Sequence, residues 1–142
     1  MNDKALLEAA AKAYWGSEID DTCSIRWLDK DECIGYTHGD NQDHNGCDIE
    51  VCWDPLEYDA DAFRLAVKLR LDIDNGSPSD GNRYVCAYRC GIAMVRDPVS
   101  EIEEIEDECQ RLAATRRAIV RAAAEIGAAI GGAKPKHTKQ LQ

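Results

Sequence analysis

Apolar residues recur at helical spacing in two segments of the N-terminal half of the chain. Near the N-terminus, Asn2 and Asp3 can cap a helix that ends at Gly16. Its apolar face is formed by Leu6, Leu7, Ala10 and Tyr14. Residues 60–69 repeat this spacing after Asp59 and Asp61, either of which can cap a helix. The pattern therefore predicts an N-terminal helix and a central helix.

A third helical segment follows Pro98 and continues toward the C-terminus. Its apolar positions alternate three and four residues apart, and only Arg116 interrupts the line: Ile102, Ile105, Cys109, Leu112, Ile119, Ala123, Ile126 and Ile130. Because Thr115 can cap a new helix, we expect either one long helix or two helices with a break near residues 113–115. Gly131-Gly132 is expected to end the segment.

Shorter segments between the helices have the residue types and the alternation of β-strands. The predicted strands cover residues 22–28, 33–38, 47–53, 71–74 and 83–94, of which the last forms a strand or a hairpin. Pro55 cannot donate a hydrogen bond to a strand ladder, so the third strand should end at Trp53. The expected fold class is α+β: an antiparallel β-sheet of about five strands, packed by the N-terminal helix, the central helix and the long C-terminal helix.

A chain of 142 residues has the length of one domain. We expect a single α+β domain over residues 1–132, followed by a disordered basic tail over residues 133–142. The N-terminal segment carries charges throughout and has no unbroken apolar run. Neither a signal peptide nor a membrane span is therefore predicted.

Charge is unevenly distributed along the chain, whose net charge is −10. Residues 1–112 hold 11 Lys and Arg against 26 Asp and Glu, a net of −15, whereas residues 113–142 hold 6 against 1, a net of +5. An acidic body repels nucleic acid and attracts basic protein surfaces. Direct binding to duplex nucleic acid is therefore not expected, although an excess of acid can also serve solubility alone.

The cysteine and histidine residues include candidate metal ligands. In a chain without an export signal, the seven cysteines are expected to be reduced thiols, most of them small core residues. Four thiol and imidazole side chains have the chemistry of a zinc site, although their spacing is loose and contains no C-x-x-C pair: Cys33, His38, His44 and Cys47. The alternative is core cysteines beside a polar hairpin loop, and we expect no cofactor.

Several motifs in the central and C-terminal parts of the chain resemble a known family. They are Trp53-Asp54-Pro55-Leu56, the helix DADAFRLAVKL at residues 59–69, the strand after it, and ATRRAIVRAAAEIG at residues 114–127. This combination is similar to the phage ABA sandwich domain of small proteins from tailed phages and prophages. The matching positions are Trp53, Pro55, Asp61, Ala62, Leu65, Leu69, Ala118 and Ile119. Because these motifs are structural, the resemblance implies fold and phage origin more than activity.

Two charged groups in the C-terminal helical segment are candidate binding residues. Arg116, Arg117 and Arg121 could hold a phosphate or the acidic helix of another subunit, and their alternative role is pairing with the acidic body. The acidic run at residues 101–108 looks like an addition to the family pattern. Its candidate partner-binding residues are Glu101, Glu104, Asp107 and Glu108.

The sequence contains no nucleophile elbow, phosphate loop or zinc-hydrolase helix, so an enzyme is not expected. The resemblance implies a phage-encoded accessory binding protein in the host cytoplasm that acts against host defence. Its partner would be a host defence protein that contacts the acidic surface, or a phosphate-bearing nucleotide signal held by the arginines. The alternative is a structural or regulatory phage module, with or without bound zinc. The apolar line of the C-terminal segment is also compatible with a homo-oligomer.

Overall fold

The computed structural model of the chain describes residues 2–16, 23–75, 84–98 and 104–140, with side chains described in these ranges except at 97–98, 104–107 and 131–140. The helices in these ranges are α1 (Asp3–Trp15), α2 (Asp59–Leu69) and α3 (Glu104–Gln140). The strands are β1 (Cys23–Leu28), β2 (Cys33–Gln42), β3 (Asp48–Trp53), β4 (Asp72–Asp74), β5 (Tyr84–Arg89) and β6 (Ala93–Pro98). The α+β class is confirmed.

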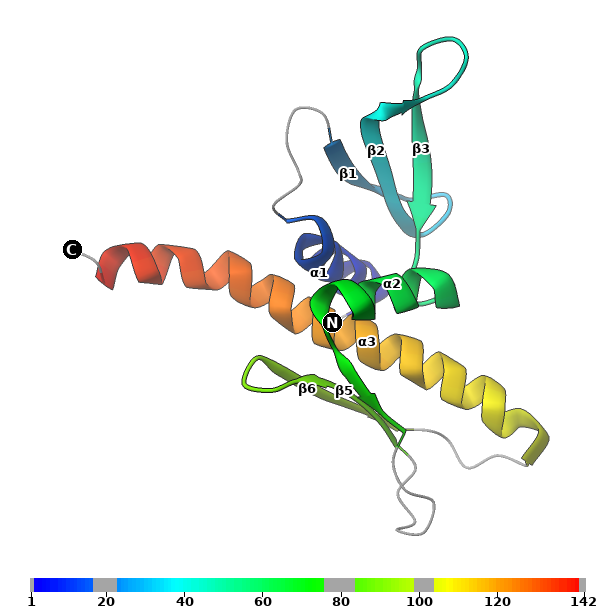
Figure 1. Cartoon of the computed structure of the whole chain (residues 1–142), viewed down its shortest axis with the longest axis vertical. Coiled ribbons are helices and arrows are strands. Elements are labelled where there is room, and N and C mark those ends of the chain that lie inside the picture. The colour runs from blue at the N-terminus through cyan, green and yellow to red at the C-terminus, as the bar shows by residue number, and fades with distance from the viewer. Residues whose placement is uncertain (1, 17–22, 76–83, 99–103, 141–142) are drawn as a thin grey trace.

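The described strands form two three-stranded antiparallel sheets, with the orders β1-β2-β3 and β4-β5-β6. The expectation of about five strands in one sheet is not confirmed. β3 ends at Trp53, and Pro55 and α2 then carry the chain away before β4 begins at Asp72. Figure 1 shows the consequence: the three helices lie between the sheets, with β1–β3 beyond α1 and α2 and with β5 and β6 along α3.

α1 and α3 pack against each other through small side chains. Ala10 and Ala11 of α1 and Ala123 of α3 are all 0% exposed. Gly127 continues this face of α3, and a Cβ atom added there would overlap the backbone carbonyl oxygen of Ala9. Small side chains let two helix backbones come close together, which adds dispersion contacts between backbone atoms. At position 127 the backbones of α1 and α3 lie so close together that only glycine fits.

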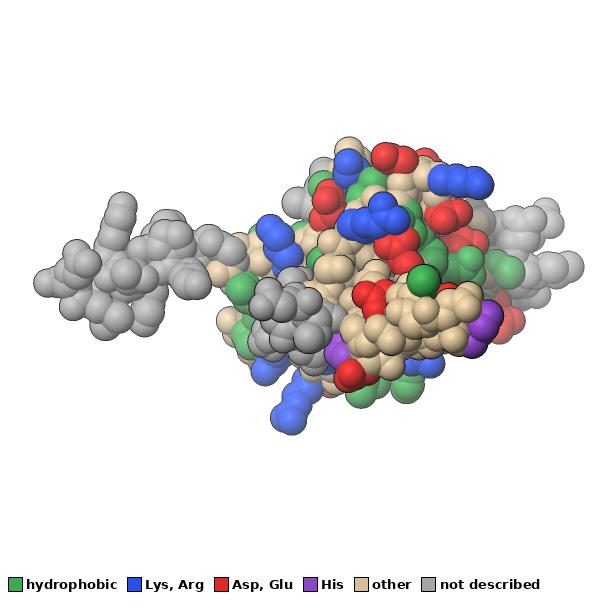
Figure 2. Space-filling view, turned by 90° about the horizontal axis from the view of Figure 1, so that it is seen from above, with side chains coloured by type: hydrophobic (Ala, Val, Ile, Leu, Met, Phe, Trp, Pro, Cys, Tyr) green, Lys and Arg blue, Asp and Glu red, His purple; other side chains and the backbone are tan. Residues whose placement is uncertain are grey.

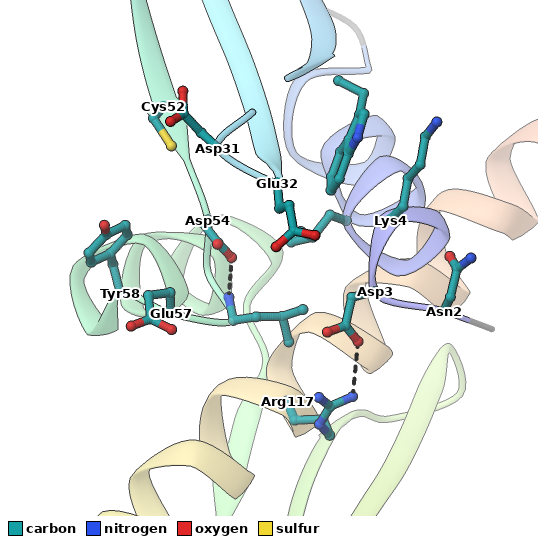
Figure 3. Close-up of a pocket in the computed structure, with 13 residues that line it drawn as sticks. Asn2, Asp3, Lys4, Asp31, Glu32, Cys52, Asp54, Glu57, Tyr58 and Arg117 are labelled. Atoms are coloured by element: carbon teal, nitrogen blue, oxygen red, sulfur yellow. Dashed lines mark hydrogen bonds and ion pairs between the residues drawn. The ribbon is translucent and has the colours of Figure 1, made fainter. Parts of the chain in front are cut away.

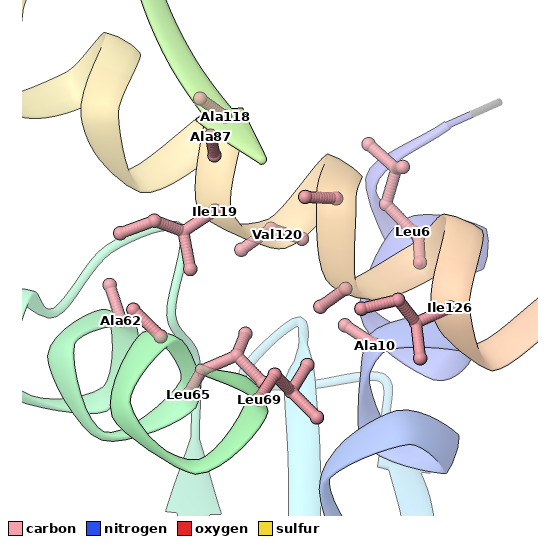
Figure 4. Close-up of a cluster of buried hydrophobic side chains, with 14 of the residues drawn as sticks. Leu6, Ala10, Ala62, Leu65, Leu69, Ala87, Ala118, Ile119, Val120 and Ile126 are labelled. Atoms are coloured by element: carbon pink, nitrogen blue, oxygen red, sulfur yellow. The ribbon is translucent and has the colours of Figure 1, made fainter. Parts of the chain in front are cut away.

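Larger apolar side chains from four elements converge on the interior beside this helix pair, as Figure 4 shows for α1, α2, α3 and β5. Leu65 of α2, Val85 of β5 and Val120 of α3 are each 0% exposed. The predicted apolar line of α3 is buried at Ile119 and Ile126. The middle of α3 therefore lies at the centre of the molecule, where it contacts α1, α2, β5 and β6.

An aromatic cluster joins the sheet β1–β3 to α1. The ring of Trp15 stacks on Tyr36 of β2 with centroids 4.6 Å apart, and it meets Trp53 of β3 at an angle of 60° and a distance of 4.9 Å. Tyr14 also stacks on Trp53, at 5.5 Å. Each such pair contributes about 0.5–1.5 kcal/mol beyond the burial of its surface. The sheet is therefore fixed to the last turn of α1.

The caps predicted for the first two helices are confirmed only in part. Asn2 caps α1 as predicted, since its side chain accepts a hydrogen bond of 2.8 Å from a backbone N–H of the first turn. Tyr58 occupies the N-cap position of α2 without a side-chain bond, and the Asp61 carboxylate instead accepts a hydrogen bond from the Asp54 N–H at 3.0 Å. The prediction that Asp59 or Asp61 caps α2 was therefore wrong.

α3 is one continuous helix across the break that the sequence left open. The hydroxyl of Thr115 donates to the carbonyl oxygen of Arg111 at 2.6 Å, within the helix, instead of capping a new one. The helix also passes through Gly131-Gly132, its expected end, since a glycine costs a helix about 1 kcal/mol without interrupting its hydrogen bonds. The division into a domain over residues 1–132 and a tail over residues 133–142 stays a prediction.

Replacement of Gly127 by Val should destabilise the fold more than replacement of Ala128 by Val. The Val side chain at position 127 must push α1 away, and overpacking of this kind costs about 1–3 kcal/mol. Ala128 is exposed on the same helix, so its variant carries only the helix propensity cost of Val, roughly 0.5 kcal/mol. Urea unfolding measures both free energies, and equal values for the two variants would contradict the close approach of α1 and α3.

Candidate functional site

A cleft of about 1170 Å³ opens where the start of α1, the turn between β1 and β2, and the segment between β3 and α2 meet (Figure 3). We call it the acidic cleft. Its lining residues are Asn2, Asp3, Lys4, Leu7, Trp27, Asp31, Glu32, Cys52, Asp54, Leu56, Glu57, Tyr58 and Arg117. These residues come from segments that lie far apart in the sequence, so only folding brings them together.

Carboxylates outnumber cations in the lining of the acidic cleft. The carboxylates are Asp3, Asp31, Glu32, Asp54 and Glu57, and the cations are Lys4 and Arg117. Nη1 of Arg117 lies 3.5 Å from Oδ1 of Asp3, and Nζ of Lys4 lies 5.7 Å from the ring centroid of Trp27. Both cations therefore already have a partner, and the cleft presents an excess of negative charge.

Asp54 is held in the cleft by the turn that follows β3. Its Oδ1 accepts a hydrogen bond from the Leu56 N–H at 3.1 Å, and its backbone carbonyl oxygen accepts one from the Glu57 N–H at 3.1 Å. Burial raises the pKa of the Asp54 carboxyl above its ordinary value, while the backbone hydrogen bonds oppose this rise and the charges of Glu57 and Asp61 add to it. The ionised form of Asp54 is thus disfavoured in the folded protein.

Arg116, predicted to bind an anion, instead anchors the segment before α2. Its Nε donates to the carbonyl oxygen of Leu56 at 2.8 Å, and its Nη1 lies 2.7 Å from Oδ1 of Asp59. The side chain is 20% exposed. Charge-assisted bonds of this kind are among the stronger ones in a protein. Arg116 therefore holds one wall of the acidic cleft against α3.

Arg117 and Arg121, the other two arginines of the predicted anion site, contact different elements. Arg117 pairs with Asp3 of α1 in the acidic cleft, and Nη1 of Arg121 donates to the carbonyl oxygen of Arg96 in β6 at 3.3 Å. The three arginines thus reach the start of α2, α1 and β6. Arg116 and Arg117 pair with carboxylates, as the alternative role expects, whereas Arg121 contacts a backbone carbonyl oxygen. The three side chains thus contact different elements, and their role in binding an anion stays a prediction.

The predicted acidic partner-binding residues of the C-terminal segment are only partly described. Glu101 lies outside the described residues, and the side chains of Glu104 and Asp107 lie outside the described side chains. Glu108 is exposed on α3 and does not line the acidic cleft. Their role as a partner-binding surface stays a prediction.

The four predicted zinc ligands are not brought together. Cys33 forms a disulfide with Cys52 on the neighbouring strand, with Cα atoms 6.3 Å apart, so the expectation of reduced thiols was wrong for this pair. Nδ1 of His38 accepts a backbone hydrogen bond at 3.0 Å, and His44 and Cys47 are exposed between β2 and β3. Among the described residues, no three His, Cys, Asp or Glu side chains are grouped as metal ligands would be.

The acidic cleft is absent from the sites predicted from the sequence. Asp31 and Glu32 lie in the turn after β1, and Asp54 and Glu57 lie in the turn after β3. Part of the cleft could have been predicted from the sequence, because the first and third strands of an antiparallel meander run in the same direction and end on the same side of the sheet. Two acidic turns at that edge predict a concentration of negative charge, whereas the contribution of α1 depends on how the helix packs and leaves no local pattern.

Comparisons of the chain with known protein families, with curated proteins and with solved structures find no match. The similarity to the phage ABA sandwich domain therefore stays a prediction. Among the helices in the described ranges, none combines the length and the hydrophobicity that crossing a membrane requires.

Replacement of Asp54 by Asn should change how stability depends on pH. Because the pKa of Asp54 is raised on folding, the folded wild type keeps this proton to a higher pH than the unfolded chain. The wild type therefore loses stability as the pH rises from the ordinary carboxyl pKa, about 4, through the raised value. Asn keeps the acceptor for the Leu56 N–H and does not titrate.

Urea unfolding of wild type and Asp54→Asn over a pH series should thus show the variant gaining relative stability across this window and a constant difference above it. The control is Asp72→Asn, which removes an exposed carboxylate from β4. If the free energies of unfolding of Asp54→Asn and of the wild type changed by the same amount at every pH, the raised pKa of Asp54 would be disproved.

Proposed function

We propose that the protein is a non-enzymatic binding protein whose acidic cleft takes a basic segment of a partner protein. The observation that carries this proposal is the lining: five carboxylates face two cations, and both cations already have a partner. A Lys or Arg side chain entering the cleft would meet carboxylate oxygens from three segments of the chain. The net charge of −10 would also speed its approach.

Aromatic side chains in the cleft favour arginine as the residue that enters it. Trp27 and Tyr58 both line the cleft, and Tyr58 is 55% exposed. A guanidinium group can lie flat on such a ring while its N–H groups donate to carboxylates at the edge. Lys4, itself exposed, places its ammonium over Trp27, which illustrates how a cation from a partner would use this ring.

Negative charge around the cleft supports a protein partner over a nucleic acid or a nucleotide. Figure 2 shows Asp and Glu side chains spread over the face seen from above, with Lys and Arg side chains among them. The excess of carboxylates in the cleft lining and the net charge of −10 both disfavour phosphates. The arginines expected to hold a nucleotide signal are bonded to three different elements, so they offer that ligand no common site.

The biological role that we propose is counter-defence in the host cytoplasm, with a host defence protein as the partner. Defence effectors that act on nucleic acid need basic surfaces, and a cleft lined with carboxylates can occupy such a surface in place of phosphates. The phage origin in this proposal rests on the sequence resemblance, and the acidic cleft supplies the means of binding.

Neutralising the cleft should weaken capture of a basic segment. The probe is a fluorescent nona-arginine peptide, and the variant is Asp31→Asn/Glu32→Gln/Glu57→Gln, which leaves the Asp54 turn intact. Loss of three nearby charges should raise the Kd at least about tenfold by fluorescence polarisation, because close charge pairs across an interface contribute strongly. Added salt should weaken wild-type binding steeply.

The matched control removes the same three charges elsewhere, as Asp72→Asn/Glu108→Gln/Glu125→Gln, all exposed in the structure. It should change the Kd less than about twofold. Equal losses of affinity in both triple variants would show diffuse electrostatic attraction and would contradict the cleft proposal.

The counter-defence role is tested separately by plating phage that carry the wild-type or the cleft-variant gene. The variant should plate poorly only on hosts with an active defence system, and equal plating on all hosts would refute that role.

A further inference from the structure

The acidic cleft contains one end of a disulfide as well as its carboxylates. Cys33, the first residue of β2, is bonded to Cys52 of β3, with Cα atoms 6.3 Å apart. Cys52 is exposed and lines the cleft, whereas Cys33 is 1% exposed. Figure 3 shows Cys52 among the carboxylates of the lining. The Cys52 side of the bond is therefore the accessible one.

The disulfide joins the segments that carry the two acidic turns of the cleft. Cys33 directly follows Asp31 and Glu32 in the chain, and Cys52 lies two residues before Asp54. In the register of β2 and β3, Cys33 lies one residue beyond the last pair. The disulfide therefore ties the end of the first turn to the strand that leads into the second, at a point where the ladder provides no pair.

The arrangement of the two turns is unfavourable in itself. Asp31 and Glu32 in one turn and Glu57 in the other bring charges of the same sign to one cleft, so the turns repel each other. Glu32 also has a φ of 50°, a left-handed conformation that a residue with a side chain adopts at a cost. A covalent link between the two segments limits how far they can separate. Opening the disulfide should therefore let these carboxylates move apart.

The remaining cysteines favour a reversible bond over a permanent one. All seven cysteines lie in the described ranges, and five of them are free. Three of the free thiols are exposed: Cys47, Cys90 and Cys109. Exposed thiols persist in a reducing compartment, where a disulfide is as a rule transient and serves catalysis or redox sensing. Exposed disulfides are also among those that exchange most readily with thiols.

We infer that Cys33–Cys52 is a thiol–disulfide exchange site that controls the acidic cleft, with a dithiol as its reductant. This inference rests on the proposed function, because the controlled property is capture of a basic segment. The oxidised form holds the two acidic turns together and binds the segment, and the reduced form binds it weakly. A site already held in its binding geometry binds more tightly, because less order has to be gained on binding.

Reduction begins at the accessible sulfur. A thiolate of the dithiol attacks Sγ of Cys52, the bond between the two protein sulfurs breaks, and Sγ of Cys33 leaves as a thiolate that takes up a proton. The second thiolate of the dithiol then attacks the dithiol's own sulfur in the mixed disulfide, which releases Cys52 as a thiolate that is protonated in turn. The protein gains two electrons and two protons, and the dithiol becomes an intramolecular disulfide. A disulfide of the same class oxidises the protein by the reverse steps.

Nona-arginine binding to the full chain in its two redox states tests the inference. After mild oxidation with glutathione disulfide, alkylation and mass spectrometry should count five thiols, and after dithiothreitol seven. Reduction should raise the Kd at least about fivefold by fluorescence polarisation, because the turns are no longer held together. Circular dichroism checks that the reduced chain is folded.

A single substitution opens the same bond without a reductant. Cys52→Ala leaves the buried Cys33 in place, and its Kd should match that of the reduced wild type and should not respond to dithiothreitol. The matched control is Cys90→Ala, which removes an exposed free thiol from the turn after β5. This control should bind like the wild type in both redox states.

The exchange site and the cleft proposal fail in different ways. Equal Kd values for the oxidised and the reduced wild type overturn the inference and leave the cleft proposal standing, and a count of seven thiols after oxidation also overturns the inference. If nona-arginine binds neither form, the cleft proposal fails and hydrogen exchange decides the inference. Reduction should then speed exchange of the backbone amides in the turn at residues 29–32, and unchanged rates overturn the inference as well.

Discussion

The close approach of α1 and α3 is the contact on which the rest of the structure depends. Gly127 lies against the Ala9 carbonyl, and fully buried alanines continue the face on both helices. Each sheet is then built on one member of the pair: Trp15 of α1 holds β1–β3 through Tyr36, and the buried face of β5 lies toward α3. A small sheet needs a hydrophobic face to bury or a helix to pack against, and the helix pair provides that surface for both sheets.

The same packing assembles the acidic cleft. It brings Asp3 and Lys4, at the start of α1, beside Arg117 of α3, while Arg116 ties the segment before α2 to the same helix. Carboxylates from three segments are thereby held near one another although like charges repel. Burial of Asp54 disfavours its ionised form as well. In the proposed function, a cationic partner would relieve this repulsion.

Local patterns in the sequence predict the elements well and their assembly poorly. The Asn2 cap of α1 and the end of β3 at Trp53 follow from side-chain chemistry and from Pro55, and both are confirmed. Strand alternation does not state which strands pair, so the two sheets formed by the six strands of the described residues could not be distinguished from one sheet of about five. The two acidic turns of the cleft follow strands that end on the same side of a meander and so could have been predicted, whereas the contribution of α1 and the Cys33–Cys52 disulfide depend on packing between distant segments and have no local signal.

Native-state hydrogen exchange tests most directly whether the α1–α3 contact unites the molecule. If both sheets depend on this helix pair, backbone amides of β2 and β5, on opposite sides of it, should exchange through one opening event. Their free energies of opening and their dependence on denaturant should then coincide. Opening of β2 at a clearly lower free energy, with β5 still protected, would show that the two sheets are stabilised separately and would contradict the account.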